Sequence, residues 1–403
     1  MINLEIPKKF KPLVNQANQV AQEVFRPISR KYDEAEHSYP KELDMLASLI
    51  DGMNEGSDIG GAGAAGVRRE SNGNDDGNRN GSNLSTVLGI IELCWGDVGL
   101  LLSMPRQGLG NSAIASVASD EQLERYGGKW AAMAITEPEA GSDSASIRTT
   151  ADLSGDEYVL NGEKIFVTSG DRADLIVVWA TLDRSVGRAA IKSFIVERDN
   201  PGLKLDRLEH KLGIRASDTA NFTLQNCRVP KEALLGDPEV NTKQGFGGAM
   251  QTFDNTRPLV AAMAVGVTRA ALEETRKRLE EAGVEIDYDA PALGQSAAAA
   301  RYLEMESDYE AAHLLTLQAA WMADNGKPNS LQASMAKAKA GRTCVDVALG
   351  CVELCGSVGY AENDLLEKWA RDAKILDIFE GTQQIQLLIV ARQLLGKSSS
   401  ELR

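Results

Sequence analysis

The sequence predicts an α+β fold with three consecutive regions: helices, then strands, then a helical bundle. Apolar residues recur every three or four positions in residues 13–49 and 84–126 and again after residue 245, which is the period of an amphipathic helix. Between them the pattern alternates and turn residues interrupt it, as is typical of strands. We therefore expect an N-terminal helical domain at 1–130, a β-barrel-like or β-sandwich domain at 131–238, and a C-terminal four-helix bundle at 239–403.

Within the N-terminal region, a helical pattern runs from Leu13 to about Leu49 with a new start at Pro40, and another runs from Leu84 to about Tyr126. Residues 51–83 differ, because glycine, asparagine and charged residues dominate them. Such a segment buries too little apolar surface to offset the entropy lost on ordering. We expect a mobile insert there.

In the middle region, strands are expected at 147–153, 163–168, 175–180, 193–197 and 221–224. Residues 154–156 predict a turn, and the Asn161-Gly162 pair is typical of a hairpin. Helices are then expected to about residue 281, over 293–324 and over 330–355, and the short connections between them predict an antiparallel bundle.

Composition limits the function classes. The chain has 403 residues and a formal net charge of −15, which disfavours nucleic acid and anionic membrane surfaces as partners. No apolar run is expected to span a membrane, and the N-terminal residues lack a signal-peptide core. The five cysteines and three histidines form no metal-binding or disulfide spacing. These features predict a cytoplasmic protein without a metal.

Glu380 is the most informative single residue. It follows the apolar residues Ile378 and Phe379 and precedes Gly381, whose backbone freedom allows a sharp turn. Thr382 can cap a following helix, so Glu380 should lie at a break between two helices. Loss of hydration there raises the pKa of a carboxyl group, which suits a general base. The alternative is a solvated glutamate at a helix end, the commoner case for an isolated Glu.

The surrounding phrases extend this hypothesis. Residues 372–392, DAKILDIFEGTQQIQLLIVAR, resemble the C-terminal signature of the acyl-CoA dehydrogenases, and residues 134–143, AITEPEAGSD, resemble the family's flavin-binding signature. The resemblance implies FAD as cofactor, an acyl-CoA thioester as substrate and Glu380 as the base that removes its α-proton. It also implies electron-transfer flavoprotein as the electron acceptor.

The same resemblance assigns binding residues. Ile135 and Thr136 would face the pyrimidine edge of the flavin, and Gly141 would let the backbone approach the ligand. Phe166 would cover one flavin face, where the family more often has tryptophan, and Thr168 would bond near flavin N5. The expected cofactor-binding residues are Ile135, Thr136, Gly141, Ser142, Phe166, Val167, Thr168, Thr382 and Gln384. The expected substrate-binding residues are Ser142, Asp254, Arg257 and Gly381.

For two of these residues an alternative stays open. Phe166 is also compatible with a core position in a strand, and Arg257, inside an apolar helical stretch, with a structural ion pair.

Two segments depart from the family pattern. Where the family has Arg-x-x-Phe-Gly, which holds the FAD pyrophosphate across a dimer interface, residues 280–289 contain no arginine and several acids. Where it has Gln-x-x-Gly-Gly, this chain has Glu353-Leu354-Cys355-Gly356-Ser357. Carboxylates repel a pyrophosphate. We therefore expect a related second subunit in an α2β2 tetramer, with a homotetramer as the alternative.

Two other functions remain compatible with the sequence. An acyl-CoA oxidase would share the fold and the base but pass its electrons to oxygen. A non-catalytic structural subunit would only complete the site of a partner.

Overall fold

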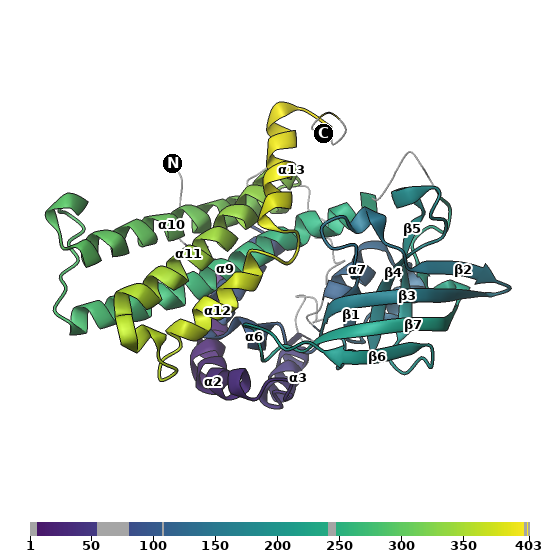
Figure 1. The fold of residues 1–403 in the computed structure, drawn as a ribbon, viewed down its shortest axis with the longest axis horizontal. Coiled ribbons are helices and arrows are strands. Elements are labelled where there is room, and N and C mark those ends of the chain that lie inside the picture. Colours follow the sequence, from purple (N-terminus) through teal and green to yellow (C-terminus); the bar gives the residue numbers. More distant parts are fainter. Residues whose placement is uncertain (1–5, 55–79, 107–108, 241–246, 399–400, 402–403) are drawn as a thin grey trace.

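The computed structural model describes residues 6–54, 80–106, 109–240, 247–398 and 401. It confirms the α+β class and the predicted order of regions, with a sheet placed beside a long helical bundle (Figure 1). The strands of the described residues belong to one eight-stranded sheet with the order β6-β7-β3-β2-β4-β5-β8, and β1 pairs with β4. The middle region is therefore a single connected sheet.

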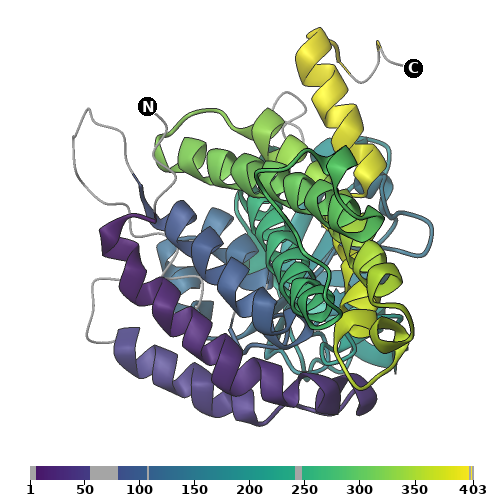
Figure 2. The same ribbon diagram turned by 90° about the vertical axis from the view of Figure 1, so that its left-hand side faces the viewer.

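The first N-terminal helices pack along one side of the bundle (Figure 2). They are α1 (Lys11–Val20), α2 (Arg26–Glu34), α3 (Glu42–Asn54), α5 (Ser82–Gly96) and α6 (Val98–Leu101), with a π-helical turn at Ala21–Phe25. The next two helices, α7 (Leu109–Val117) and α8 (Asp120–Tyr126), belong to the sheet side.

The boundaries predicted for the insert are wrong at both ends. Residues 51–54 belong to α3, and α5 already begins at Ser82; residues 55–79 lie outside the described residues. The N-terminus of α5 is capped by a residue that is distant in the sequence. The carboxylate of Asp324 accepts hydrogen bonds from the backbone N–H groups of Gly81 (2.7 Å) and Leu84 (3.0 Å). A cap supplied by a residue some 240 positions along the chain leaves no local signal in the sequence.

The strands are β1 (Ala131–Ala134), β2 (Thr150–Ser154), β3 (Glu157–Thr168), β4 (Leu175–Thr181), β5 (Ile191–Glu197), β6 (Leu203–Leu208), β7 (Thr219–Pro230) and β8 (Leu234–Leu235). Turn 154–156 joins β2 to β3 as predicted. The hairpin predicted at Asn161-Gly162 is wrong, because both residues lie inside β3 at an irregularity in its pairing with β7. A Cβ at Gly162 would lie 2.4 Å from Thr149 Oγ1, so this glycine permits close packing rather than a turn.

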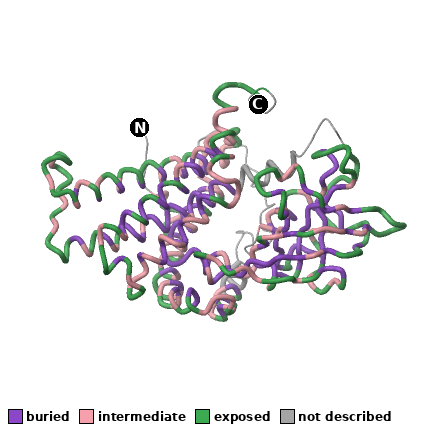
Figure 3. Tube along the Cα trace, viewed as in Figure 1, coloured by how far each residue is buried: buried purple, intermediate pink, exposed green. Residues whose placement is uncertain are grey.

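The C-terminal helices are α9 (Gly247–Glu281), α10 (Ala297–Asp324), α11 (Ser330–Tyr360), α12 (Leu366–Leu376) and α13 (Gln383–Leu395). The first three run alongside one another, and α13 projects from the end of the bundle nearest the sheet (Figure 1). Buried residues gather inside the bundle and within the sheet (Figure 3). Residues Ile114, Tyr126 and Trp130, from α7, α8 and the segment that follows, pack into the core of the sheet.

Helix α11 is long enough and apolar enough to cross a membrane. The prediction that no segment has the length and composition of a membrane span is therefore wrong. This helix packs against α9, α10, α12 and α13, and 44% of its most apolar 18-residue stretch is buried inside the protein. One helix of this kind in the described residues, packed against four others, is weak evidence for a membrane.

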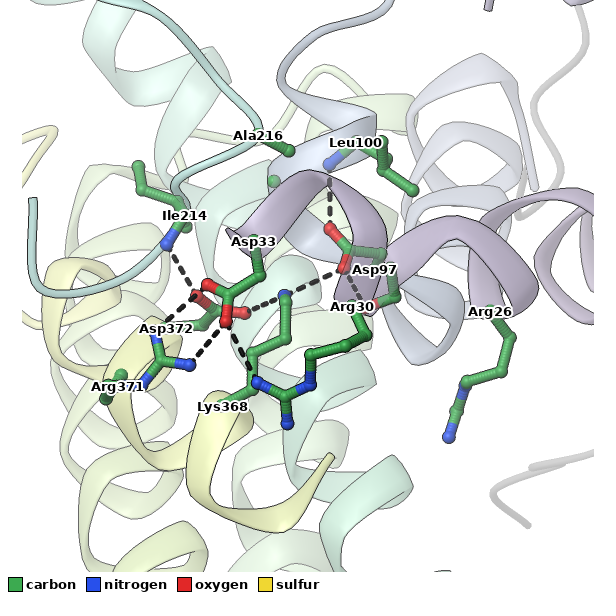
Figure 4. A network of polar contacts seen from close by, with 12 residues as sticks. Arg26, Arg30, Asp33, Asp97, Leu100, Ile214, Ala216, Lys368, Arg371 and Asp372 are labelled. Carbon is green, nitrogen blue, oxygen red and sulfur yellow. Dashed lines mark hydrogen bonds and ion pairs between the residues drawn. The ribbon is translucent and has the colours of Figure 1, made fainter. Parts of the chain in front are cut away.

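A buried ionic network joins the N-terminal helices to α12 (Figure 4). Lys368 Nζ donates to Asp97 Oδ2 (2.8 Å) and Asp372 Oδ2 (2.6 Å), and all three side chains are almost completely buried. Asp97 also caps α6 by accepting the N–H of Leu100 at 2.8 Å. Asp372 accepts the N–H of Ile214 from the connection between β6 and β7. Burial by itself disfavours the ammonium charge, but the two carboxylates raise the pKa of Lys368 above its usual value.

A second layer of charge surrounds this network. The guanidinium of Arg371 holds both carboxylate oxygens of Asp33, one of them at 3.0 Å from Nη1, so α12 is tied to α2 as well. The connection between β6 and β7 rests directly on α12, because a Cβ at Gly213 would lie 2.5 Å from the carbonyl oxygen of Arg371.

We expect Lys368→Met to lower the free energy of unfolding by about 3–5 kcal/mol, because it leaves Asp97 and Asp372 buried without a cation. Urea denaturation followed by circular dichroism measures the change. Lys231→Met is the matched control, since Lys231 makes an exposed pair with Asp156 and its loss should change little. An equal loss of unfolding free energy in the two variants would contradict the stabilising role of the buried network.

Candidate active site

Glu380 occupies a tight turn between α12 and α13, as the sequence predicts. Glu380 and Gly381 both have left-handed backbone angles, with φ of 55° and 91°. Thr382 caps α13, its hydroxyl accepting the N–H of Ile385 at 3.4 Å. A left-handed angle is strained for a residue with a side chain. The turn therefore requires contacts that hold it in place.

Two buried side chains supply these contacts. Gln386 Nε2 donates to the carbonyl oxygens of Glu380 (3.0 Å) and Gly381 (3.2 Å). Lys337 Nζ, from α11, donates to the carbonyl oxygen of Gly381 at 2.8 Å. The φ of Gly381 is one that strains other residues, and a Cβ there would lie 2.4 Å from Gln386 Nε2 and displace that side chain. The turn that carries Glu380 is thus clamped from α11 and α13.

Three groups act on the carboxylate of Glu380. Desolvation raises its pKa, whereas the hydrogen bond from Thr256 Oγ1 to Oε2 (2.9 Å) and the charges of Arg257 and Lys337 oppose that rise. The net direction is upward. Burial in turn lowers the pKa of Lys337 to about 8. Glu380 is consequently a carboxylate with increased basicity that keeps part of its surface accessible.

A second group of predicted residues lies between β1 and β3. The segment with Ile135 and Thr136 follows β1, and Ile165 N donates to the carbonyl oxygen of Thr136 at 2.9 Å. Lys164, which is fully buried, donates to Ile135 O (3.1 Å) and to Glu137 Oε1 (2.7 Å). Burial lowers the pKa of Lys164 to about 8, against the pull of Glu137. This ion pair fixes the segment against the sheet.

Phe166 points out of the sheet. Its backbone has φ of 59° within the bulge where the pairing of β3 with β7 shifts, and its N–H donates to Asn221 Oδ1 at 3.1 Å. The side chain is 59% exposed, which excludes the alternative of a core position. Val167 is buried in the core of the sheet, so only its backbone remains for a cofactor contact. Thr168 is half-buried at the end of β3.

The segment after Thr136 leaves room beside it. Gly141 and Ser142 are exposed, and a Cβ added at Gly141 would meet nothing in the described chain. An exposed aromatic ring, nearby hydroxyl groups and an uncrowded glycine together suit a flat, polar ligand with an extended ring system. These residues therefore fit the flavin that the sequence predicts.

Three predicted residues remain, namely Arg257, Gln384 and Asp254. Arg257 is 3% exposed and lies close enough to Glu380 to influence its charge. Gln384 is exposed on α13. The side chain of Asp254 lies outside the described residues.

Sequence reasoning missed the residues that support the site, namely Thr256, Lys337, Gln386, Glu137 and Lys164. Glu137 and Gln386 stand inside the two quoted signatures, Lys164 lies in a predicted strand, and Thr256 precedes Arg257, so polar residues at these places were the available signal. Lys337 lies in α11 with no local sign of a role.

Comparisons with known proteins identify two matching family models and several relatives. A family model described as acyl-CoA dehydrogenase, C-terminal domain, matches residues 243–395, and one described as acyl-CoA dehydrogenase, middle domain, matches residues 132–227. The chain is 32% identical over 405 residues to the mitochondrial short-chain specific acyl-CoA dehydrogenase of Homo sapiens, covering 98% of this chain and 92% of that protein.

Two further relatives are similar over most of their length. The short-chain specific acyl-CoA dehydrogenase of Clostridium acetobutylicum is 35% identical over 326 residues, covering 78% of this chain and 83% of that protein. The solved structure of butyryl-CoA dehydrogenase from Megasphaera elsdenii matches with a TM-score of 0.81 and 30% identity, covering 98% of this chain and 100% of that one.

We expect Lys337→Met to raise the pKa of Glu380 further, because it removes a cation that favours the ionised carboxylate. Infrared titration of ¹³C-glutamate-labelled protein measures this pKa, with Glu380→Gln identifying the band. Lys339→Met is the control, since Lys339 pairs with Asp308. An unchanged pKa in Lys337→Met would show that the lysine acts on the turn alone.

Proposed function

Because this chain belongs to the acyl-CoA dehydrogenase family, we propose that Glu380 is the base that removes the α-proton of its acyl-CoA substrate. Members of the family are FAD-dependent enzymes, so the chain is an FAD-dependent acyl-CoA dehydrogenase. The observation that carries the proposal for Glu380 is its desolvated carboxylate in a clamped turn. A base with a raised pKa is better matched to an unactivated proton.

The chain's own residues account for the proton's path. The ionised carboxylate of Glu380 takes the α-proton of the thioester and becomes neutral, which desolvation favours. Thr256 orients the accepting group through its hydrogen bond to Oε2. The clamp by Gln386 and Lys337 holds the backbone that follows Glu380. The N–H of Glu380 is the expected donor to the thioester oxygen as charge develops there. When bound, FAD supplies the acceptor for the β-hydrogen as hydride, and the product is a trans-2-enoyl-CoA.

The cofactor would be held on the sheet side. Ile135, Thr136 and Ser142 would contact its polar edge, Phe166 would cover one ring face, and Thr168 would donate from the end of β3. Gly141 would allow close approach. Lys164 and Glu137 would not touch the ligand but would hold the segment in position.

The electron acceptor distinguishes the two flavin-dependent functions. We propose electron-transfer flavoprotein, as in a dehydrogenase, rather than oxygen, as in an oxidase. Stopped-flow reoxidation of the reduced enzyme by oxygen and by a ferricenium-type acceptor separates the two. A structural subunit without its own chemistry is the third reading, and a purified protein without yellow cofactor, alone or with any partner, would support it.

The assembly proposal rests on the end of the bundle farthest from the sheet. The connection between α9 and α10 lies there (Figure 1), and its residues Glu285, Asp287 and Asp289 are exposed acids. The nearest arginines are already engaged: Arg276 pairs with Glu280 (2.9 Å) and Arg278 with Asp364 (2.9 Å). Since α11 runs antiparallel to α10, the exposed Glu353 and Ser357 near its C-terminus belong to the same end.

This end therefore offers carboxylates where the family pattern has an arginine and a glutamine. We propose that a related subunit, which keeps those groups, completes the FAD site of this chain in an α2β2 tetramer. The exposed leucines of α13, Leu387, Leu388, Leu394 and Leu395, are consistent with further burial in an assembly. The alternative is a homotetramer that holds FAD through substituted contacts.

We expect Glu380→Gln to retain FAD and to reduce flavin bleaching by acyl-CoA by about 10²–10⁴-fold or more, because the amide has no basic lone pair. Anaerobic stopped-flow absorbance with butyryl-CoA and longer acyl-CoAs measures the rate. Glu362→Gln, at an exposed glutamate between α11 and α12, is the control and should react like the parent. Flavin reduction in Glu380→Gln at more than a tenth of the parent rate would contradict the assignment of Glu380 as the base.

The raised pKa of Glu380 also predicts the pH profile. The base must be ionised, so kcat/KM should fall as the pH drops through this pKa, at a pH above that of an ordinary glutamate. Initial rates across a pH series test this. If kcat/KM instead falls only at the pKa of an ordinary glutamate, the proposal that Glu380 is a desolvated base is contradicted.

We expect the chain expressed alone to bind less than one FAD per subunit, because like charges weaken binding of the pyrophosphate by about 1 kcal/mol each at partly exposed positions. Flavin absorbance against protein concentration, with mass by light scattering, measures both quantities. A stable homotetramer that carries one FAD per chain and turns over acyl-CoA would refute the heteromeric assembly without affecting the role of Glu380.

A further inference from the structure

Two histidines that are far apart in the sequence meet in the structure. Glu36 and His37 follow α2, and His210 lies in the connection between β6 and β7. One ligand atom from each of these three side chains lies within 4.8 Å of the other two. The imidazole rings of His37 and His210 are 4.8 Å apart between centroids, with their planes at 60°.

His37 is unusual among the described residues. Both of its ring nitrogens are buried, and neither has a hydrogen-bond partner in the part of the chain that the structure describes. Its backbone is left-handed, with φ of 70°. Burial lowers the pKa of its imidazole, so the ring is neutral and offers a lone pair. A buried, unsatisfied imidazole costs free energy unless a ligand satisfies it.

Glu36 is oriented by its surroundings. Its Oε1 accepts the N–H of Lys211 at 2.8 Å, and its Oε2 lies 2.8 Å from His210 Nδ1. Burial works against its charge, but the contacts with His210 and Lys211 lower its pKa, so the carboxylate is ionised. A ligating carboxylate held by a backbone N–H through its second oxygen is a common arrangement in metal sites.

We propose that Glu36, His37 and His210 bind a divalent transition-metal ion, with Zn²⁺ as the best-suited ion. Two imidazole nitrogens and one carboxylate oxygen form a borderline donor set that Zn²⁺ accepts in tetrahedral geometry, leaving the fourth position for water. His210 is exposed on 82% of its side chain, so solvent reaches its ring.

Two cationic side chains lie near the site. The ammonium of Lys211 lies nearby but donates to Ser217 O at 2.7 Å, and Arg172 is paired with Asp218. His37 also lines a cavity of about 480 Å³ whose wall carries four aspartates and two arginines. This cavity borders the site on the side of His37.

A metal here would connect two parts of the chain. It would join the connection after α2 to the connection between β6 and β7, which already contacts α12 through Ile214 and Asp372. The site shares no residue with the one built around Glu380. The expected effect is therefore on stability rather than on the chemical step.

The test is Zn²⁺ titration of the EDTA-treated, FAD-loaded protein by isothermal calorimetry, with melting temperature recorded in parallel. We expect one Zn²⁺ per chain and a higher melting temperature. His210→Ala and Glu36→Gln should each weaken binding by at least about tenfold, whereas Glu34→Gln, an exposed glutamate two residues earlier, should not. Because His210 is exposed, its substitution should leave the fold intact.

Cobalt distinguishes this site from the cysteines. Co²⁺ bound by nitrogen and oxygen should give visible ligand-field bands without thiolate charge-transfer absorption. A thiolate band, equal Zn²⁺ affinity in His210→Ala and the parent, or no binding by the parent would each overturn the proposal.

Discussion

The ammonium of Lys368, buried between Asp97 and Asp372, is the interaction on which the arrangement of the helices around the site depends. Removing two carboxylates and an ammonium from water is costly, and the cost is offset only when every partner is in place. The network therefore allows one mutual placement of α6, α12 and the connection between β6 and β7. Since α12 leads directly into the turn at Glu380, the position of the base follows from this network.

The turn itself stores strain that other contacts offset. A left-handed residue with a side chain costs on the order of 1–3 kcal/mol. Gln386 and Lys337 satisfy both carbonyl groups of the turn, and glycine at 381 leaves the space that Gln386 fills. The result is a carboxylate held in a desolvated but accessible place, which is the condition for a base that acts on a weakly acidic proton.

Buried lysines recur as organising groups. Lys164 ties the segment after β1 to β3, Lys337 holds the turn at Glu380, and Lys368 joins α12 to the N-terminal helices; each is at most 1% exposed. Each ammonium has several donors and can bridge groups from different elements. Buried lysines thus position both halves of the proposed site, the one on the sheet and the one at the end of the bundle.

The sequence by itself determined the features that depend on neighbours along the chain: the order of helical and strand regions, the break at Glu380, the need for Gly381 and the cap by Thr382. Periodicity and capping act within a few residues, so they are visible locally. Only the tertiary structure decided that Asn161-Gly162 lies inside a strand, that Thr256 meets Glu380 across 124 positions, and that His37 lies beside His210. These contacts arise from packing of distant segments, for which a single sequence carries no periodic signal.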